Sequence, residues 1–348
     1  MLRKILLLFC LYLGAHAAFS QQARDTFTNP LLTSGADPWV IYHDGFYYYT
    51  NSTGNNLVIW KTKNMAQLAQ APRTVIWTPP TGTDHSHELW APELHLLNGH
   101  WYMYFAADEG HNEHHRLFVI ENPDADPTTS NWTFKGQVSD ATNKWAIDAS
   151  VFENKGELYL IWSGWEGDSN GQQNIYIAKL KNPTTVEGKR MLLSKPEYEW
   201  ETHGDLHDAA NPPHVNVNEG PEILKHGHKL FLVYSASGCW TDFYSLGMLT
   251  ADENSNLLDA ASWKKSAKAV FTQSPQNGVY APGHNSFFQS PDGKENWILY
   301  HANPAPGCGC DGKRSPRMQK FTWKSDGSPD FGVPMKTSEV LAAPSQQK

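Results

Sequence analysis

The 348-residue sequence predicts an all-β fold, built as a single-domain, five-bladed β-propeller. Three observations predict it. A hairpin pattern recurs five times along the chain, and no stretch combines a helical period with capping residues. The composition is 40% hydrophobic and 12% aromatic, which is enough to fill a core and excludes a disordered chain.

Each copy of the pattern joins a glycine-containing turn to an alternating, aromatic-rich run that is typical of a β-strand. The turn glycines recur every 54 to 71 residues, and the runs that follow them are 46–49, 101–105, 158–162, 230–234 and 297–300. A short strand precedes each hairpin, and another strand follows most of them. Three or four antiparallel strands at this period predict one propeller blade per copy.

The first residues are typical of an export signal. Arg3 and Lys4 precede an apolar run over 5–13, and 15–17 supply a small-residue cleavage site. The run is too short for a permanent membrane anchor. We therefore predict a signal peptide over residues 1–20, the propeller over 21–348, and a secreted or periplasmic protein. A lipid anchor on Cys10 is the minor alternative, because Phe9 stands where a lipoprotein needs a small residue.

Charge and cysteine content exclude several classes of protein. The chain has 28 basic and 36 acidic residues, a net charge of −8, and no run of Lys or Arg, so neither nucleic acid nor an anionic membrane is expected as a partner. Without the signal, Cys239, Cys308 and Cys310 remain, which allow at most one disulfide. Cys308 and Cys310 lack the second pair that a zinc site needs.

The strand that opens each blade lines the central channel of a propeller, so polar residues at these strands face one space. They are Asp37, Glu93, Asp148, Glu219 and His284. Convergent carboxylates in an aromatic-lined cavity suit glycoside hydrolysis, in which one acid donates a proton while another stays ionised. Repulsion between like charges raises the pKa of at least one of them and so separates the two roles.

The ordered motifs of these strands resemble glycoside hydrolase family 43 over residues from about 27 to 334. They are Gly35-Ala36-Asp37-Pro38-Trp39, Trp90-Ala91-Pro92-Glu93, Ile147-Asp148-Ala149-Ser150, Asn218-Glu219-Gly220-Pro221 and Gly283-His284-Asn285-Ser286. The resemblance implies an inverting hydrolase with Asp37 as general base and Glu219 as general acid. It implies that Asp148 orients the acid and tunes its pKa.

The resemblance also implies a calcium ion on the propeller axis at His284. Calcium prefers oxygen ligands, so water would complete its shell around a single imidazole. Two other histidine-rich stretches, 111–115 and 203–208, do not match the HExxH pattern of a zinc site and lie in polar, turn-rich sequence. We interpret them as loops or as residues at the substrate rim.

Four further residues are candidates for sugar binding. Trp90, Trp165 and Trp240 lie at the edges of blade strands, where an indole ring can stack on a sugar at the mouth of an acidic cavity. Arg317 matches a family position on the last blade that reaches the sugar.

Within the family, the segments 163–167 and 234–240 look most like the exported α-L-arabinofuranosidases. We therefore expect release of L-arabinofuranose from arabinan or arabino-oligosaccharides, with exo action on α-1,5 linkages, and a plant cell-wall polysaccharide or oligosaccharide as partner. A β-xylosidase, an endo-arabinanase and a sugar-binding propeller without catalysis are the alternatives. The presence of all three carboxylates argues against the last, and Ala36 argues against the related β-fructosidases, which would carry Asn there.

Overall fold

The computed structural model describes residues 25–169, 172–204 and 215–346, and this part of the chain is all-β, as predicted. Its helical segments are short 3₁₀ turns: η1 (Met65–Gln70), η2 (Asn112–His114), η3 (Glu199–Glu201), η4 (Ala260–Ser262) and η5 (Pro275–Asn277). None of the helices in these ranges has the length and apolar character needed to cross a bilayer. The predicted signal peptide, 1–20, falls outside the described residues.

The strands form five antiparallel, four-stranded units in chain order. Unit one contains β2 (Trp39–His43), β3 (Phe46–Thr50), β4 (Leu57–Thr62) and β5 (Arg73–Trp77). Unit two contains β6 (His87–Leu97), β7 (His100–Asp108), β8 (Arg116–Asn122) and β9 (Thr133–Gln137). Unit three contains β10 (Ala146–Asn154), β11 (Glu157–Trp165), β12 (Gln172–Asn182) and β13 (Thr185–Ser194). Unit four contains β14 (Asn216–His226), β15 (Lys229–Ala236), β16 (Ser245–Asp252) and β17 (Lys264–Lys265). Unit five contains β18 (Tyr280–Gln289), β19 (Asn296–Asn303), β20 (Ser315–Trp323) and β21 (Pro329–Asp330).

The predicted glycine turns join the first and second strands of the units. In units one to three both turn residues are left-handed, with φ of 47° and 80° at Asp44 and Gly45 and similar values at the equivalent pairs in units two and three. Two residues with positive φ make the tight turn whose twist matches that of the flanking strands. Glycine adopts this conformation without the Cβ clash that other residues meet, which is why it recurs there.

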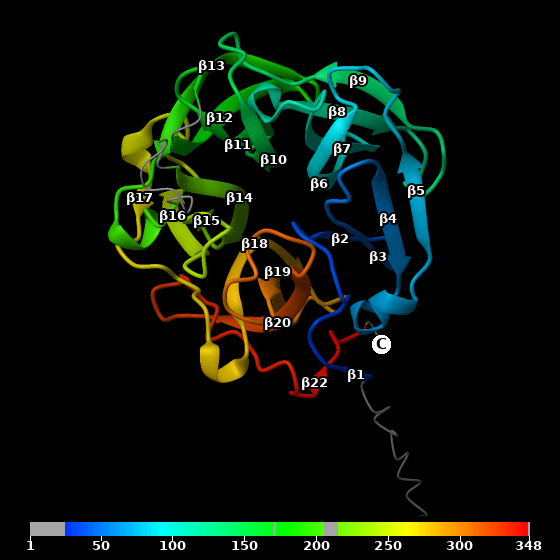
Figure 1. Ribbon diagram of the computed structural model, residues 1–348, viewed down its shortest axis with the longest axis vertical. Helices are drawn as coiled ribbons and strands as arrows, with labels where there is room; N and C mark the ends of the chain where they lie inside the picture. Colours follow the sequence, from blue (N-terminus) through cyan, green and yellow to red (C-terminus); the bar gives the residue numbers. More distant parts are fainter. Residues whose placement is uncertain (1–24, 170–171, 205–214, 347–348) are drawn as a thin grey trace, which may run out of the picture.

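The units are arranged in a ring around a central space, and the first strand of each, β2, β6, β10, β14 or β18, lies nearest the centre (Figure 1). Two pairings outside the units tie the ring together. β1 (Thr26–Phe27) pairs with β22 (Leu341–Ala342), which joins the two ends of the described chain. The start of β12 pairs in parallel with the start of β14, which links units three and four.

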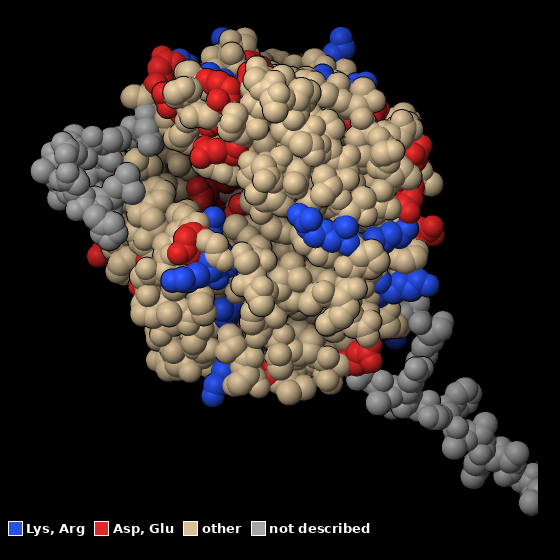
Figure 2. Space-filling model, turned by 45° about the vertical axis from the view of Figure 1, so that its right-hand side comes forward, with Lys and Arg blue, Asp and Glu red and all other residues tan. Residues whose placement is uncertain are grey.

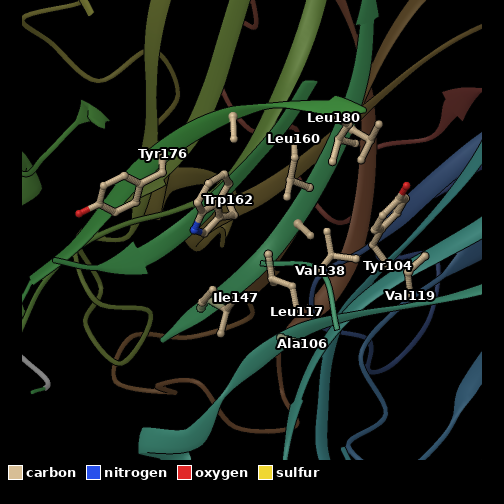
Figure 3. Packing of buried hydrophobic residues seen from close by; sticks show 14 of the residues in the cluster. Tyr104, Ala106, Leu117, Val119, Val138, Ile147, Leu160, Trp162, Tyr176 and Leu180 are labelled. Atoms are coloured by element: carbon tan, nitrogen blue, oxygen red, sulfur yellow. The ribbon is translucent and has the colours of Figure 1, made fainter. Parts of the chain in front are cut away.

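The buried hydrophobic side chains of the described residues form five clusters, and each lies between two neighbouring units. Figure 3 shows the cluster between units two and three, where Tyr104 and Leu117 face Leu160 and Trp162. Because successive side chains of a strand point to opposite faces, one strand contributes side chains to two clusters. In β3, Tyr47 and Tyr49 pack between units five and one, whereas Tyr48 packs between units one and two. Packing between neighbours therefore holds the inner strands, and the residues at their ends, in a fixed arrangement.

Candidate active site

A cavity of about 550 Å³ opens where the inner strands begin. It is lined by Asp37, Asp148 and Glu219 together with Trp90, Trp145, Trp165, Trp240, His284 and Arg314 and by the loops between them. Figure 2 shows a hollow in one face of the molecule with Asp or Glu atoms inside it. The three carboxylates predicted from the sequence thus share one cavity, although they come from units one, three and four.

One backbone feature recurs at this end of all five units. The residue at the equivalent motif position is left-handed in each, with φ between 44° and 57°: Asp37, Ala91, Asp148, Gly220 and His284. In units two to five the pairing of the inner strand with its neighbour shifts register at the same place. Such an irregularity bends the strand and redirects a side chain.

The repeat also shows that Glu219 is not the strict equivalent of Asp37 and Asp148. Gly220 holds the left-handed position in unit four, and Glu219 precedes it by one residue. A Cβ atom at Gly220 would lie 3.1 Å from Nδ1 of His284, closer than most Cβ contacts. Glycine therefore satisfies both the backbone angle and the space, while the neighbouring glutamate reaches the cavity.

Asp37 lies just before β2 in a pocket of donors. The Ser52 hydroxyl donates to its Oδ2 over 2.5 Å, and Nη1 of Arg314 lies 3.4 Å from its Oδ1. Burial acts to raise the pKa of Asp37, but nearby positive charge and the Ser52 hydrogen bond outweigh it and hold the pKa below its ordinary value. Because burial lowers the pKa of His284 and His301 and favours their neutral forms, Arg314 is the permanent positive charge beside this carboxylate.

Glu219 is in the opposite electrostatic state. Burial raises its pKa to about 7, with a further contribution from the negative charge of Asp37. The Tyr244 hydroxyl donates to Oε1 over 2.7 Å, which favours the ionised form and limits the rise. Near neutral pH this carboxyl can therefore hold a proton or release it, as a general acid requires.

Asp148 contacts the backbone that carries Glu219. Its Oδ2 accepts the N–H of Gly220 over 2.8 Å, so its carboxyl fixes the peptide that follows Glu219. Burial, the charge of Glu219 and that of Asp37 raise the pKa of Asp148 well above its ordinary value. The Asp148 carboxyl is thus placed to hold the backbone next to Glu219.

Glu93, the polar residue of unit two, does not line the cavity. It is 5% exposed, lies close enough to Glu222 to interact electrostatically, and contacts His95, with 3.0 Å between Oε2 and Nε2. Neither Glu93 nor Glu222 is therefore placed to donate a proton inside the cavity.

The three predicted tryptophans all line the cavity. Trp165 stacks on Trp145 with ring centroids 4.6 Å apart, and Trp90 stacks on the imidazole of His115 at 4.0 Å. The indole N–H groups of Trp165 and Trp240 are buried and have no acceptor among the described residues. Aromatic walls with unused donors are suited to a sugar, which offers both apolar ring faces and hydroxyl acceptors.

The prediction for Arg317 is wrong. Its side chain is 1% exposed within β20 beside Tyr300, and it does not reach the cavity. Arg314, three residues earlier and just before β20, lines the cavity instead and contacts Asp37. The sequence places both in one basic segment, and only the start of the strand decides which side chain is directed into the site.

His284 lies beside the general-base candidate, with 3.3 Å between its Nδ1 and Oδ1 of Asp37. The adjacent Asn285 and Ser286 carry buried polar side-chain atoms that have no hydrogen-bond partner in the described part of the chain. Among the described residues His284 does not belong to a group of three metal-ligating side chains. This donor set fits a hydrated ion held mainly through water, and it does not form a cage of protein oxygens.

Sequence reasoning missed three residues that support the carboxylates. Ser52 binds Asp37 and also accepts the N–H of Ala91 over 2.7 Å, Tyr244 binds Glu219, and His301 accepts the N–H of Asp37 over 3.0 Å. They lie in the second strands of their units or in the loops that follow these strands, so no motif adjacent to the carboxylates could identify them.

A disulfide joins the rim of the cavity across units four and five. It links Cys239 and Cys310, which both line the cavity, and leaves Cys308 free. One bond with one cysteine left over was among the possibilities that the sequence allowed. The bond restrains the loops that carry Trp240 and Arg314.

The chain is similar in sequence and in structure to several known proteins. The chain is 38% identical over 92% of its length to an extracellular exo-α-(1→5)-L-arabinofuranosidase of Streptomyces avermitilis, and 35% identical over 89% to α-L-arabinofuranosidase 43 of Humicola insolens. It spans 66% and 64% of the lengths of these two relatives. The crystal structure of an α-L-arabinofuranosidase from Lactobacillus brevis superposes with a TM-score of 0.83 at 37% identity, covering 90% of this chain and 98% of that one. Residues 27–329 match the family described as Glycosyl hydrolases family 43, and the chain belongs to that family.

Proposed function

We propose that the protein is an inverting glycoside hydrolase that releases L-arabinofuranose from the ends of α-1,5-linked arabinan or arabino-oligosaccharides. The observation that carries the proposal is the pair of opposite carboxyl states in one cavity. Arg314 and Ser52 help to keep Asp37 ionised, while burial brings the pKa of Glu219 to about 7. Glycoside hydrolysis needs this division into base and acid.

In the proposed mechanism Asp37 removes a proton from a water molecule, which attacks the anomeric carbon. Glu219 donates its proton to the departing glycosidic oxygen, and Asp148 holds the Glu219 backbone in place through Gly220. In an inverting enzyme the two reacting carboxyls are about 6.5–9.5 Å apart, which leaves room for the water. Arg314 and Ser52 keep Asp37 ionised, but by stabilising its negative charge they also make it a weaker base. In the proposed mechanism the exclusion of water from the cavity supplies much of its reactivity.

Support for arabinose as the substrate comes from the relatives, whose names state arabinofuranosidase activity. The test is analysis of the products from linear arabinan, debranched arabino-oligosaccharides and xylo-oligosaccharides. We expect monomeric arabinose from the linear chain, with proton NMR showing the inverted anomer first. Xylose release alone would exclude arabinose specificity, and a mixture of long oligosaccharides would indicate endo action.

We further propose a single-domain, five-bladed β-propeller over residues 21–348 in an exported protein. The five packed units, the ring in Figure 1 and the β1–β22 pairing support the architecture. The extracellular relatives support export, and the signal-like residues 1–20 agree with it. The proposed partner is an arabinose-containing polysaccharide or oligosaccharide of the plant cell wall.

We also propose that a calcium ion binds at His284, largely through water. It would supply positive charge next to Asp37, in addition to that of Arg314. After treatment with a chelator, calcium is expected to restore activity to the wild-type enzyme. In His284→Gln the same addition is expected to give no gain, and an equal gain would place the ion elsewhere.

A further inference from the structure

Three metal-ligating side chains meet in unit two, outside the catalytic cavity. Glu88 comes from β6, Asp108 from the end of β7, and His115 immediately precedes β8. Their ligand atoms lie within 4.8 Å of one another. Asp108 and His115 are fully buried, whereas Glu88 is exposed, so the cluster has both an enclosed floor and an opening to solvent.

The Asp108 carboxylate is only half satisfied by the protein. Its Oδ1 accepts the N–H of Gly110 over 2.7 Å, but its Oδ2 is buried and receives no hydrogen bond from any described residue. Nδ1 of His115 lies 3.0 Å from Oδ2, a contact that is an ion pair only when the imidazole is protonated. A buried anionic oxygen without a donor is costly, and a cation would remove that cost.

Both ring nitrogens of His115 face oxygen atoms that accept hydrogen bonds. Its Nε2 lies 3.2 Å from the carbonyl oxygen of Glu88, and its Nδ1 lies 3.2 Å from the carbonyl oxygen of Asn112 and 3.0 Å from Oδ2 of Asp108. A neutral imidazole has a single N–H, so a cation between Nδ1 and Oδ2 would satisfy the side that this N–H does not reach. Metal-bound histidines commonly donate their other N–H to a carbonyl or carboxylate in this way.

The separation of two of these atoms matches that of ligands of one small ion. Ligands about 2.1 Å from zinc lie roughly 3.0–3.4 Å apart for bond angles between about 90° and 109°. The 3.0 Å between Nδ1 of His115 and Oδ2 of Asp108 falls in this range.

We propose that Glu88, Asp108 and His115 form a binding site for a divalent metal ion, with zinc the favoured ion. An imidazole combined with carboxylates suits zinc, whereas calcium prefers an all-oxygen shell. The exposed Glu88 provides the route of entry.

The site adjoins the aromatic wall of the cavity. The His115 ring stacks on Trp90, and Nε1 of Trp145 donates to the Asn112 carbonyl over 2.7 Å. Both tryptophans line the cavity, but the three side-chain ligands do not. The ion would therefore fix the position of the sugar-binding wall and take no part in bond cleavage.

The test is zinc binding to the chelator-treated, full-length protein, measured by isothermal titration calorimetry and by metal analysis after gel filtration. We expect a bound zinc ion in the wild type that persists in His284→Gln. Binding should weaken at least about 10-fold in Glu88→Gln, Asp108→Asn and His115→Gln, since each loses a ligand. Glu88 is exposed, so its variant should fold even if the buried substitutions do not, and circular dichroism checks this.

His114→Ala and Glu113→Gln are the matched controls. Both residues are exposed and lie in the same loop, and neither belongs to the cluster, so their variants should bind zinc as the wild type does. Unchanged affinity in Glu88→Gln, loss of binding in His114→Ala, or no zinc binding to the wild type at micromolar concentration would each overturn the proposal.

Discussion

Asp37→Asn is expected to lower hydrolysis of every arabinoside by about 10²–10⁴-fold, the usual contribution of a general base. The loss should not depend on the leaving group, because the attacking water must be deprotonated whichever group departs. Asparagine has nearly the same shape as aspartate and tolerates the left-handed backbone at this position, where φ is 57°. The contact with Ser52 can therefore persist while the basic oxygen is lost. Steady-state kinetics on an oligosaccharide and an aryl arabinofuranoside measure the effect.

Two controls identify the lost function as proton removal. Azide attacks without being deprotonated, so it should restore part of the activity of Asp37→Asn on the aryl substrate and produce a glycosyl azide. Asp168→Asn removes an exposed carboxylate that pairs with Lys144, and it should leave the rates unchanged. Wild-type-like rates in Asp37→Asn would remove this residue from the mechanism.

Glu219→Ala is expected to separate substrates by their leaving groups. An arabinosyl alkoxide is a poor leaving group and needs a proton, whereas an aryl oxide with an electron-withdrawing ring departs without one. Activity on arabino-oligosaccharides should fall about 10²–10⁴-fold, and activity on the aryl substrate should fall much less. Asp148→Asn should follow the same pattern with a smaller loss, because it disturbs the acid through Gly220 without removing it. Equal losses on the two substrates in Glu219→Ala would show that another group donates the proton.

The pH dependence provides a second measurement of the same group. Since Glu219 must be protonated to act and its pKa is about 7, kcat/KM of the wild type should fall as the pH rises through about 7. This high-pH limb, the decline of kcat/KM with rising pH, should flatten in Glu219→Ala on the aryl substrate. In Tyr244→Phe it should move to higher pH, because the lost hydrogen bond favours the ionised form. A limb that does not move in Tyr244→Phe belongs to a different residue.

Local sequence predicts those parts of the fold that local chemistry determines. The Asp44-Gly45 turn and its equivalents need residues that tolerate positive φ, and the aromatic runs after them alternate between two packing clusters. The carboxylates Asp37, Asp148 and Glu219 could be grouped because each lies at the start of an inner strand. The sequence could not predict which residue of unit four is equivalent to Asp37 and Asp148. A shift in strand register decides that Gly220, and not Glu219, takes the left-handed position.

The remaining site features depend on contacts between distant strands. Arg314 lies just before the start of β20 and Arg317 lies within it, and this difference decides which side chain reaches the cavity. No spacing rule predicts that Cys310, and not Cys308, pairs with Cys239. The HExxH pattern did not identify His115 as a possible metal ligand, for a similar reason. That pattern describes ligands on one helix, whereas His115 meets Glu88 and Asp108 from other strands of the same unit.

The left-handed backbone at Asp37, Asp148 and His284 predicts that thermal stability and activity compete in this protein. A residue other than glycine in a sparsely populated backbone region costs about 1–3 kcal/mol, and Asp37, Asp148 and His284 all carry that cost where glycine would not. Asp148 adds the burden of a buried carboxyl whose charge its surroundings disfavour. A search for heat-resistant variants guided by folding alone would therefore favour replacement of these three residues and select against catalysis, so stabilisation should be sought in the outer strands.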